Sequence, residues 1–90
     1  MHVTEPASDR QAAHEALRAA GIPGRLYCIE GVHEPAALLP DFHFLRLRDG
    51  MWETGLHERG QYVVTARFPR YEEAAACRQL LSGLIPEGSG

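Results

Sequence analysis

The dipeptide Asp49-Gly50 constrains the fold most strongly, because it stands between two runs in which apolar and polar residues alternate. A type I′ turn needs positive φ at both central residues, and Asp-Gly adopts such angles readily. The pattern therefore predicts a hairpin of two strands, residues 42–48 and 51–57, joined by a two-residue loop. In this register Leu47 lies opposite Trp52, and Arg46 lies opposite Glu53.

One face of this hairpin suits a protein core and the other suits solvent. Leu45, Leu47 and Trp52 fall on the first face, so we expect Trp52 to be buried. The second face carries Phe42, Phe44, Arg46, Arg48, Met51, Glu53 and His57. Arg46 and Glu53 suit a cross-strand pair there. The two phenylalanines suit a solvated face badly, and they indicate either a contact surface or a cover supplied by residues 31–40.

A third strand is expected at residues 61–68, but its turn allows two registers. A two-residue loop, Arg59-Gly60, would place Val63, Thr65 and Arg67 beside Trp52. A three-residue loop that begins at Glu58, with Gly60 in the left-handed conformation, would form a type I turn with a bulge. That register brings Tyr62, Val64, Ala66 and Phe68 to the Trp52 face. This second set is more apolar, so the sequence favours the three-residue loop.

The remaining segments predict two helices and one more strand. Ser8 and Gln11 fit a capping box that opens a helix ending near Ala20, with Gly21 as the residue after its C-cap. A second helix is expected to begin near Tyr71. Its recurring residues at helical spacing are Tyr71, Ala74, Cys77, Arg78, Leu81, Leu84 and Ile85. Residues 25–30 alternate as a strand, and residues 31–40 are irregular.

Together these elements predict one α+β domain over residues 1–90, with a four-stranded antiparallel sheet in α-β-β-β-β-α order. Both helices should pack on the face formed by Leu45, Leu47, Trp52, Val64 and Phe68. We expect residues 1–7 to be disordered and residues 86–90 to be a flexible tail. There is no long apolar run and no signal-peptide pattern, so we expect no membrane span and a cytoplasmic location.

No motif in the chain indicates catalysis, a metal or another cofactor. The five histidines, His2, His14, His33, His43 and His57, lack the spacing of metal ligands. Cys28 and Cys77 are expected to be core residues, because buried cysteine behaves as a small hydrophobe. We therefore expect a protein that is not an enzyme. The net charge of -3 also argues against nucleic-acid binding that depends on phosphate neutralisation.

Two parts of the chain resemble a group of small bacterial proteins. The string LRAAGIP at residues 17–23, followed by YCIEG at 27–31, is similar to their opening LREAGVP…YSLDG. RDGMWE at 48–53, ERGQ at 58–61 and residues 68–81 resemble their ending GGWEVYYSERGQRTG…F…EACRYLL. Those proteins are immunity proteins found beside secreted polymorphic toxins in high-GC bacteria. The resemblance, which covers residues 17–31 and 48–84, implies stoichiometric binding of a cognate toxin without catalytic residues.

An immunity protein of this kind is expected to bind its toxin through residues 31–41 and the adjacent outer face of the sheet, because loops vary more freely than the elements they join. The expected partner-binding residues are His33, Glu34, Leu38, Leu39, Asp41, Phe42, Phe44 and Arg46.

A DNA-binding domain is the alternative. Three antiparallel strands followed by a helix also resemble the small amino-terminal DNA-binding domain of tyrosine recombinases. Arg46, Arg48 and Arg67 would then contact DNA, although the chain is acidic overall and has no lysine.

Overall fold

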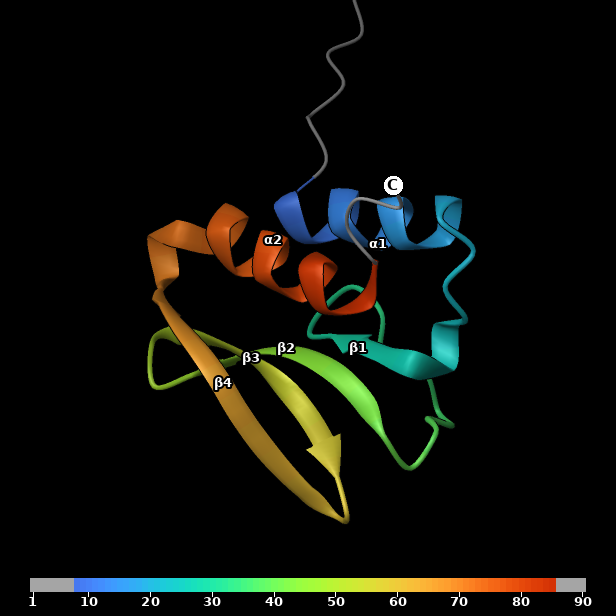
Figure 1. Ribbon diagram of the computed structural model, residues 1–90. Helices are drawn as coiled ribbons and strands as arrows, with labels where there is room; N and C mark the ends of the chain where they lie inside the picture. The colour runs from blue at the N-terminus through green and yellow to red at the C-terminus, as the bar shows by residue number, and fades with distance from the viewer. Residues whose placement is uncertain (1–7, 86–90) are drawn as a thin grey trace, which may run out of the picture.

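The computed structural model describes residues 8–85, which form a four-stranded sheet with two helices packed on one face (Figure 1). Helices α1 (Asp9–Ala19) and α2 (Glu73–Leu84) lie side by side over the sheet. The strands are β1 (Tyr27–Ile29), β2 (Phe42–Arg48), β3 (Met51–Glu58) and β4 (Gln61–Pro69), in that spatial order. The predicted α+β class, with four strands and both helices on one face, is confirmed. The expectations for residues 1–7 and 86–90 lie outside the described residues.

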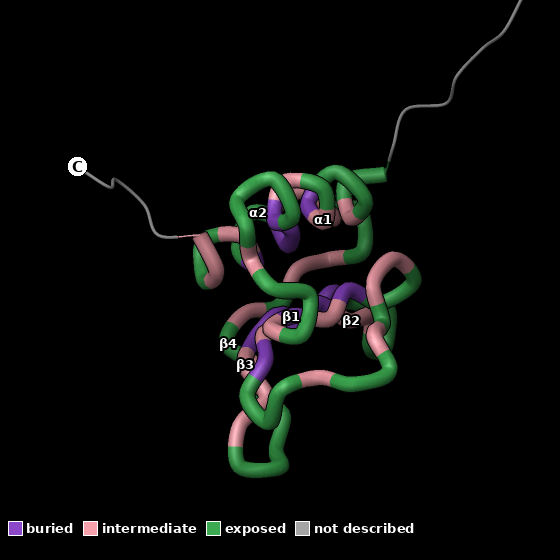
Figure 2. The backbone as a smooth tube through the Cα atoms, turned by 90° about the vertical axis from the view of Figure 1, so that its right-hand side faces the viewer, coloured by how far each residue is buried: buried purple, intermediate pink, exposed green. Residues whose placement is uncertain are grey.

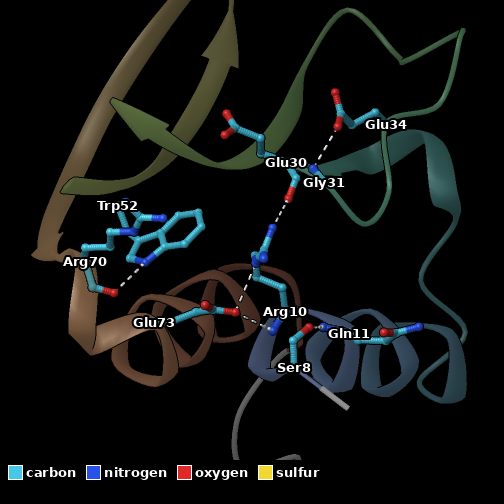
Figure 3. Close-up of polar contacts among 9 residues, drawn as sticks. All are labelled: Ser8, Arg10, Gln11, Glu30, Gly31, Glu34, Trp52, Arg70 and Glu73. Atoms are coloured by element: carbon cyan, nitrogen blue, oxygen red, sulfur yellow. Dashed lines mark hydrogen bonds and ion pairs between the residues drawn. The ribbon is translucent and has the colours of Figure 1, made fainter. Parts of the chain in front are cut away.

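Helix α1 begins and ends where its capping residues predict. The Ser8 hydroxyl oxygen accepts a hydrogen bond from the Gln11 backbone N–H at 3.1 Å (Figure 3). At the other end, Gly21 has a φ of 78°, and the Ile22 N–H donates to the Leu17 carbonyl at 3.0 Å. This is a Schellman motif, in which glycine adopts the left-handed conformation at little cost. The motif turns the chain so that Ile22 packs against the core beside fully buried Leu17.

The β2–β3 hairpin has the predicted register. Leu47 pairs with Trp52, and Asp49 and Gly50 have φ values of 50° and 78°, as a type I′ turn requires. Trp52 is buried, and its indole N–H donates to the Arg70 carbonyl at 3.0 Å (Figure 3). The prediction that Trp52 belongs to the core is confirmed.

The predicted three-residue loop between β3 and β4 is wrong. Glu58 pairs with Gln61, so the loop contains only Arg59 and Gly60. Their φ values are 52° and 76°, so both central residues have the positive φ of a type I′ turn. The twist of such a turn matches that of the flanking strands. Favourable turn geometry therefore outweighs the apolar count that favoured the longer loop.

A bulge in β4 reconciles this short loop with a core that still contains Phe68. The extra residue is Thr65, between the pairs Gly55–Val64 and Thr54–Ala66. One inserted residue reverses the face to which the side chains before it point. Ala66 and Phe68 therefore face the helices as predicted. The predicted core positions of Tyr62 and Val64 are wrong, because both precede the bulge and point to the opposite face.

Strand β1 is shorter than predicted, and it runs parallel to β2. Residues Gly24–Leu26 form a 3₁₀ turn, and only Tyr27–Ile29 pair with β2. Tyr27 lies opposite His43 and Ile29 lies opposite Leu45. The prediction of a fully antiparallel sheet is therefore wrong, because the sheet is mixed.

The course of residues 30–41, here called the return segment, explains this direction. After β1 the chain turns back, and His33 and Ile29 exchange two backbone hydrogen bonds of 2.8 Å. Further along, the Leu39 N–H donates to the Arg25 carbonyl at 3.0 Å. The return segment thus runs back along the free edge of β1, and the chain enters β2 from the same end at which it entered β1.

Helix α2 begins later than predicted, because a 3₁₀ turn, Arg70–Glu72, precedes it and no side chain caps its N-terminus. Tyr71 lies in that turn and is 86% exposed, so its predicted place on the buried face is wrong. Cys77 is buried as predicted, and burial, with smaller effects from nearby charges such as Glu73, raises the pKa of its thiol to about 11. Cys28 is only half-buried, on the opposite face of the sheet.

The core lies between the helices and the sheet, where the buried stretches of both layers face each other (Figure 2). Its buried members are Ala13, Leu17, Tyr27, Ile29, Leu45, Trp52, Ala76, Cys77 and Leu80. Arg10 joins the two layers at one end. It contacts the Glu73 carboxylate at 3.0 Å and donates to the Glu30 carbonyl at 2.6 Å (Figure 3). Its guanidinium also lies 5.1 Å from the centre of the Trp52 ring.

Candidate interaction surface

Phe42 and Phe44 point to the face of the sheet that carries no helix, yet they are only 7% and 2% exposed. Phe44 lies against Gly55 of β3, where a β-carbon would come within 3.0 Å of its Cζ atom. The absence of a side chain at Gly55 therefore creates the space that this ring fills. The expectation that Phe42 and Phe44 form an exposed contact surface is wrong, because neighbouring side chains cover both rings.

Tyr62 is the accessible member of the aromatic cluster that covers them. Its ring meets those of Phe42, Phe44 and His57 edge-on, with centroid distances of 6.2, 5.1 and 4.8 Å. The guanidinium of Arg46 lies 4.4 Å from the centre of the Tyr62 ring. Tyr62 nevertheless remains 50% exposed. Four neighbours therefore hold this ring in one orientation while half of its surface faces solvent.

The position of Arg46 is fixed by Glu53, which binds two arginines. Arg46 Nε donates to one carboxylate oxygen at 2.9 Å, and Arg67 Nε donates to the other at 3.0 Å. The predicted Arg46–Glu53 pair is thus confirmed. Burial by itself raises the pKa of Glu53, but the hydrogen bonds and charges of Arg46 and Arg67 outweigh it, and the pKa is lowered overall. The carboxylate is therefore charged at neutral pH and keeps Arg46 over Tyr62.

The return segment reaches this cluster at Pro40. His57 Nδ1 lies 3.1 Å from the Pro40 carbonyl oxygen, and the His57 ring stacks on Phe42 at 4.6 Å. Leu39, the neighbour of Pro40, is 39% exposed. The Leu39 N–H donates to the Arg25 carbonyl, at the β1 edge of the sheet, so Leu39 is not part of the cluster around Tyr62 in β4. His57 and Arg46 both contact Tyr62, and we call these three residues the Tyr62 surface.

The structure does not bring the eight residues predicted to bind a partner together in one place. Arg46 belongs to the Tyr62 surface, and Phe42 and Phe44 support it. Leu39 is exposed in the return segment, where its N–H donates to the Arg25 carbonyl. Leu38 is half-buried, and Asp41 is exposed beside Phe42. His33 instead packs towards α1, with its ring 4.6 Å from that of His14. Glu34 is exposed, and its carboxylate accepts the Gly31 N–H at 2.7 Å (Figure 3).

Sequence reasoning missed Tyr62 because it assigned this residue to the core. In residues 61–68 the apolar residues of the chosen set fall at every second position without interruption. This alternation therefore gives no sign that Thr65 is an inserted residue. One signal was available. Gly55 is an isolated glycine inside a strand, and such glycines often mark a bulge or a close approach of other groups. Here Gly55 marks both.

Comparison of the chain with protein-family models, with curated proteins and with solved structures gave no match in any of the three. Within residues 8–85, no group of three or more His, Cys, Asp and Glu side chains is arranged to hold a metal ion. No helix in this range is long and apolar enough to cross a membrane. The geometry of the Tyr62 surface is therefore the main basis for a functional proposal.

Proposed function

We propose that this chain is a small non-catalytic protein-binding domain of the cytoplasm, and specifically an immunity protein that neutralises a cognate secreted toxin by stoichiometric binding. The observation that carries the proposal is the half-exposed ring of Tyr62 beside Arg46. Tyrosine and arginine are among the residues that most often dominate the binding energy of protein interfaces.

The surroundings of Tyr62 favour binding in a second way. Immobilising a flexible side chain at an interface costs about 0.5–1.5 kcal/mol. Three aromatic rings and one guanidinium already hold Tyr62 before a partner arrives, so little of this cost remains. In this proposal Phe42 and Phe44 support the interface from beneath and do not contact the toxin themselves.

The DNA-binding alternative has less support. Arg46 and Arg67 both bind Glu53, and Arg46 is also covered by its contact with Tyr62. A sheet that reads DNA needs such arginines free to contact phosphates or guanine edges. Among the three arginines named for this role, Arg48 has no ion pair within residues 8–85. A protein partner fits this surface better.

The proposal is tested by co-expressing the chain with the toxic domain encoded by the neighbouring gene and by measuring host survival and affinity. Tyr62→Ala should weaken binding by about 1–3 kcal/mol and reduce protection, as expected for an interface anchor. Tyr71→Ala is the matched control, because Tyr71 is also exposed but lies in the turn before α2. It should protect as well as the wild type.

Two results would contradict the proposal in different ways. Full protection by Tyr62→Ala together with loss of protection by Tyr71→Ala would move the interface to the α2 end of the molecule. A neighbouring gene that encodes no secreted toxin would argue against the immunity role, whereas a binding role for the Tyr62 surface would still be open to test by affinity measurements.

A further inference from the structure

An open hollow of about 480 Å³ lies on the helix-covered side of the sheet, away from the Tyr62 surface. It is bounded by the C-terminal half of α1 and the Gly24–Leu26 turn. Its polar side chains are those of His14, Arg18, Tyr27 and His33, and none of its lining residues is acidic. Two imidazoles and one guanidinium therefore share one concave site.

His14 is oriented by a fully buried partner. Its Nδ1 atom lies 2.9 Å from the Tyr27 hydroxyl oxygen, and Tyr27 has no exposed surface. Burial raises the pKa of the Tyr27 phenol, with a smaller opposing effect from Arg18, so the hydroxyl keeps its proton at neutral pH. This hydrogen bond occupies one ring nitrogen of His14. The other nitrogen, Nε2, is left to bond a ligand.

His33 is oriented by the backbone. Its Nε2 atom lies 2.8 Å from the Gly24 carbonyl oxygen, and because a carbonyl only accepts, this nitrogen carries a proton. The His33 ring stacks on that of His14, with centroids 4.6 Å apart. A β-carbon at Gly24 would lie 3.3 Å from the His33 ring, so the glycine keeps this arrangement uncrowded. Both imidazoles are thus positioned before any ligand binds.

The charges around His14 favour an anion. Burial lowers the pKa of His14, and the positive charges of His33 and Arg18 lower it further. Glu15, on the same helix, opposes them only in part, and the neighbouring Tyr27 is neutral. Within residues 8–85, Arg18 forms no ion pair. A negative ligand would reduce the repulsion among these groups when they carry positive charge. Oriented donors in a concave site commonly attract anions.

We propose that this hollow binds a small oxyanion of the phosphate type through Arg18, His14 and His33. The guanidinium supplies a planar pair of N–H donors that matches phosphate oxygens. The two imidazoles add N–H donors when they are protonated. Anion binding and protonation of His14 favour each other, and because the pKa of His14 is lowered from its ordinary value of 6.5, affinity increases as the pH falls below that value.

The experiment titrates the intact chain with inorganic phosphate at about pH 6 and constant ionic strength, and it follows the side-chain NMR signals of His14 and His33. We expect saturable shifts at both histidines. Arg18→Gln should weaken binding about tenfold, because a charge-assisted hydrogen bond is lost. Arg18 is exposed, so the variant should fold normally. Arg78→Gln, an exposed arginine of α2 outside the hollow, should bind phosphate as the wild type does.

Two further ligands separate the sources of the phosphate group. Phenyl phosphate that binds more tightly than inorganic phosphate, and that still depends on Arg18, supports a phosphomonoester as the ligand. Equal binding that depends on Arg18 supports free phosphate. The proposal is overturned if neither histidine responds in a saturable way, or if Arg18→Gln and the wild type respond equally. Acetate that binds as tightly as phosphate would also overturn it, because the site would then attract any counter-ion.

Discussion

The ring of Phe44 lies so close to Gly55 that a β-carbon at residue 55 would come within 3.0 Å of its Cζ atom. The same β-carbon would overlap the Val63 carbonyl oxygen, which belongs to the backbone of β4. Backbone cannot move aside as a flexible side chain can. Gly55→Ala should therefore destabilise the fold by about 3 kcal/mol, measured as a lower midpoint of urea unfolding. A variant as stable as the wild type would contradict this packing of β3 against β4.

Phe44 and Tyr62 should respond differently to truncation, although they touch each other. Phe44→Ala leaves a cavity in a buried cluster and should cost about 3–5 kcal/mol of unfolding free energy. Tyr62→Ala removes a ring that is half-exposed already and should cost about 1 kcal/mol. Denaturant unfolding of the two variants measures the difference. Equal losses would contradict the division between a supporting ring and an accessible one.

Thr54 offers a stabilising substitution. Its hydroxyl is buried and is the one buried side-chain polar atom without a protein partner among the residues that the structure describes. Thr54→Val replaces this hydroxyl with a methyl group of similar size and should raise the unfolding free energy by about 1 kcal/mol. Thr65→Val is a suitable comparison, because the Thr65 hydroxyl donates to the Thr54 carbonyl at 3.3 Å and its removal should not stabilise. A destabilised Thr54→Val variant would indicate that water satisfies the hydroxyl.

Glu53 should make stability depend on pH. Because Arg46 and Arg67 lower its folded pKa below the ordinary value of 4.5, its contribution is present at neutral pH. The contribution is lost as the pH falls through the folded pKa, where the carboxylate becomes protonated in both states. Glu53→Gln should therefore cost about 2 kcal/mol at neutral pH, and the difference from the wild type should shrink in acid. Urea unfolding across that pH range tests this; a constant difference would contradict it.

The local features of the fold could be predicted because each depends on a few neighbouring residues. The Ser8 cap, the Gly21 helix end and the Asp49-Gly50 turn all fall where their sequence signals place them. The direction of β1 could not be predicted in this way. It depends on the path of the return segment, which has no periodicity and is held by backbone hydrogen bonds to β1 and Arg25. Backbone hydrogen bonds of this kind leave no pattern in the side chains.

The candidate site could be predicted only in part, because part of it depends on a register that the side-chain pattern does not show. Arg46 was identified from the alternation of the hairpin. Tyr62 was missed because its face depends on Thr65, a single inserted residue that changes no side-chain type around it. A register shift of one residue moves every preceding side chain across the sheet. Phe42 and Phe44 were then judged exposed because the ring that covers them had been placed elsewhere.

The return segment has a consequence for how these molecules could associate. Its hydrogen bonds to Ile29 of β1 and to Arg25 in the turn before β1 hold it along the outer edge of β1, whereas β4, within the described residues, pairs with a strand on one side only. Strand addition needs an edge whose N–H and C=O groups are free. Each molecule therefore offers one such edge. Edge-to-edge joining of identical copies would end with a closed pair, β4 against β4, and could not propagate into a filament.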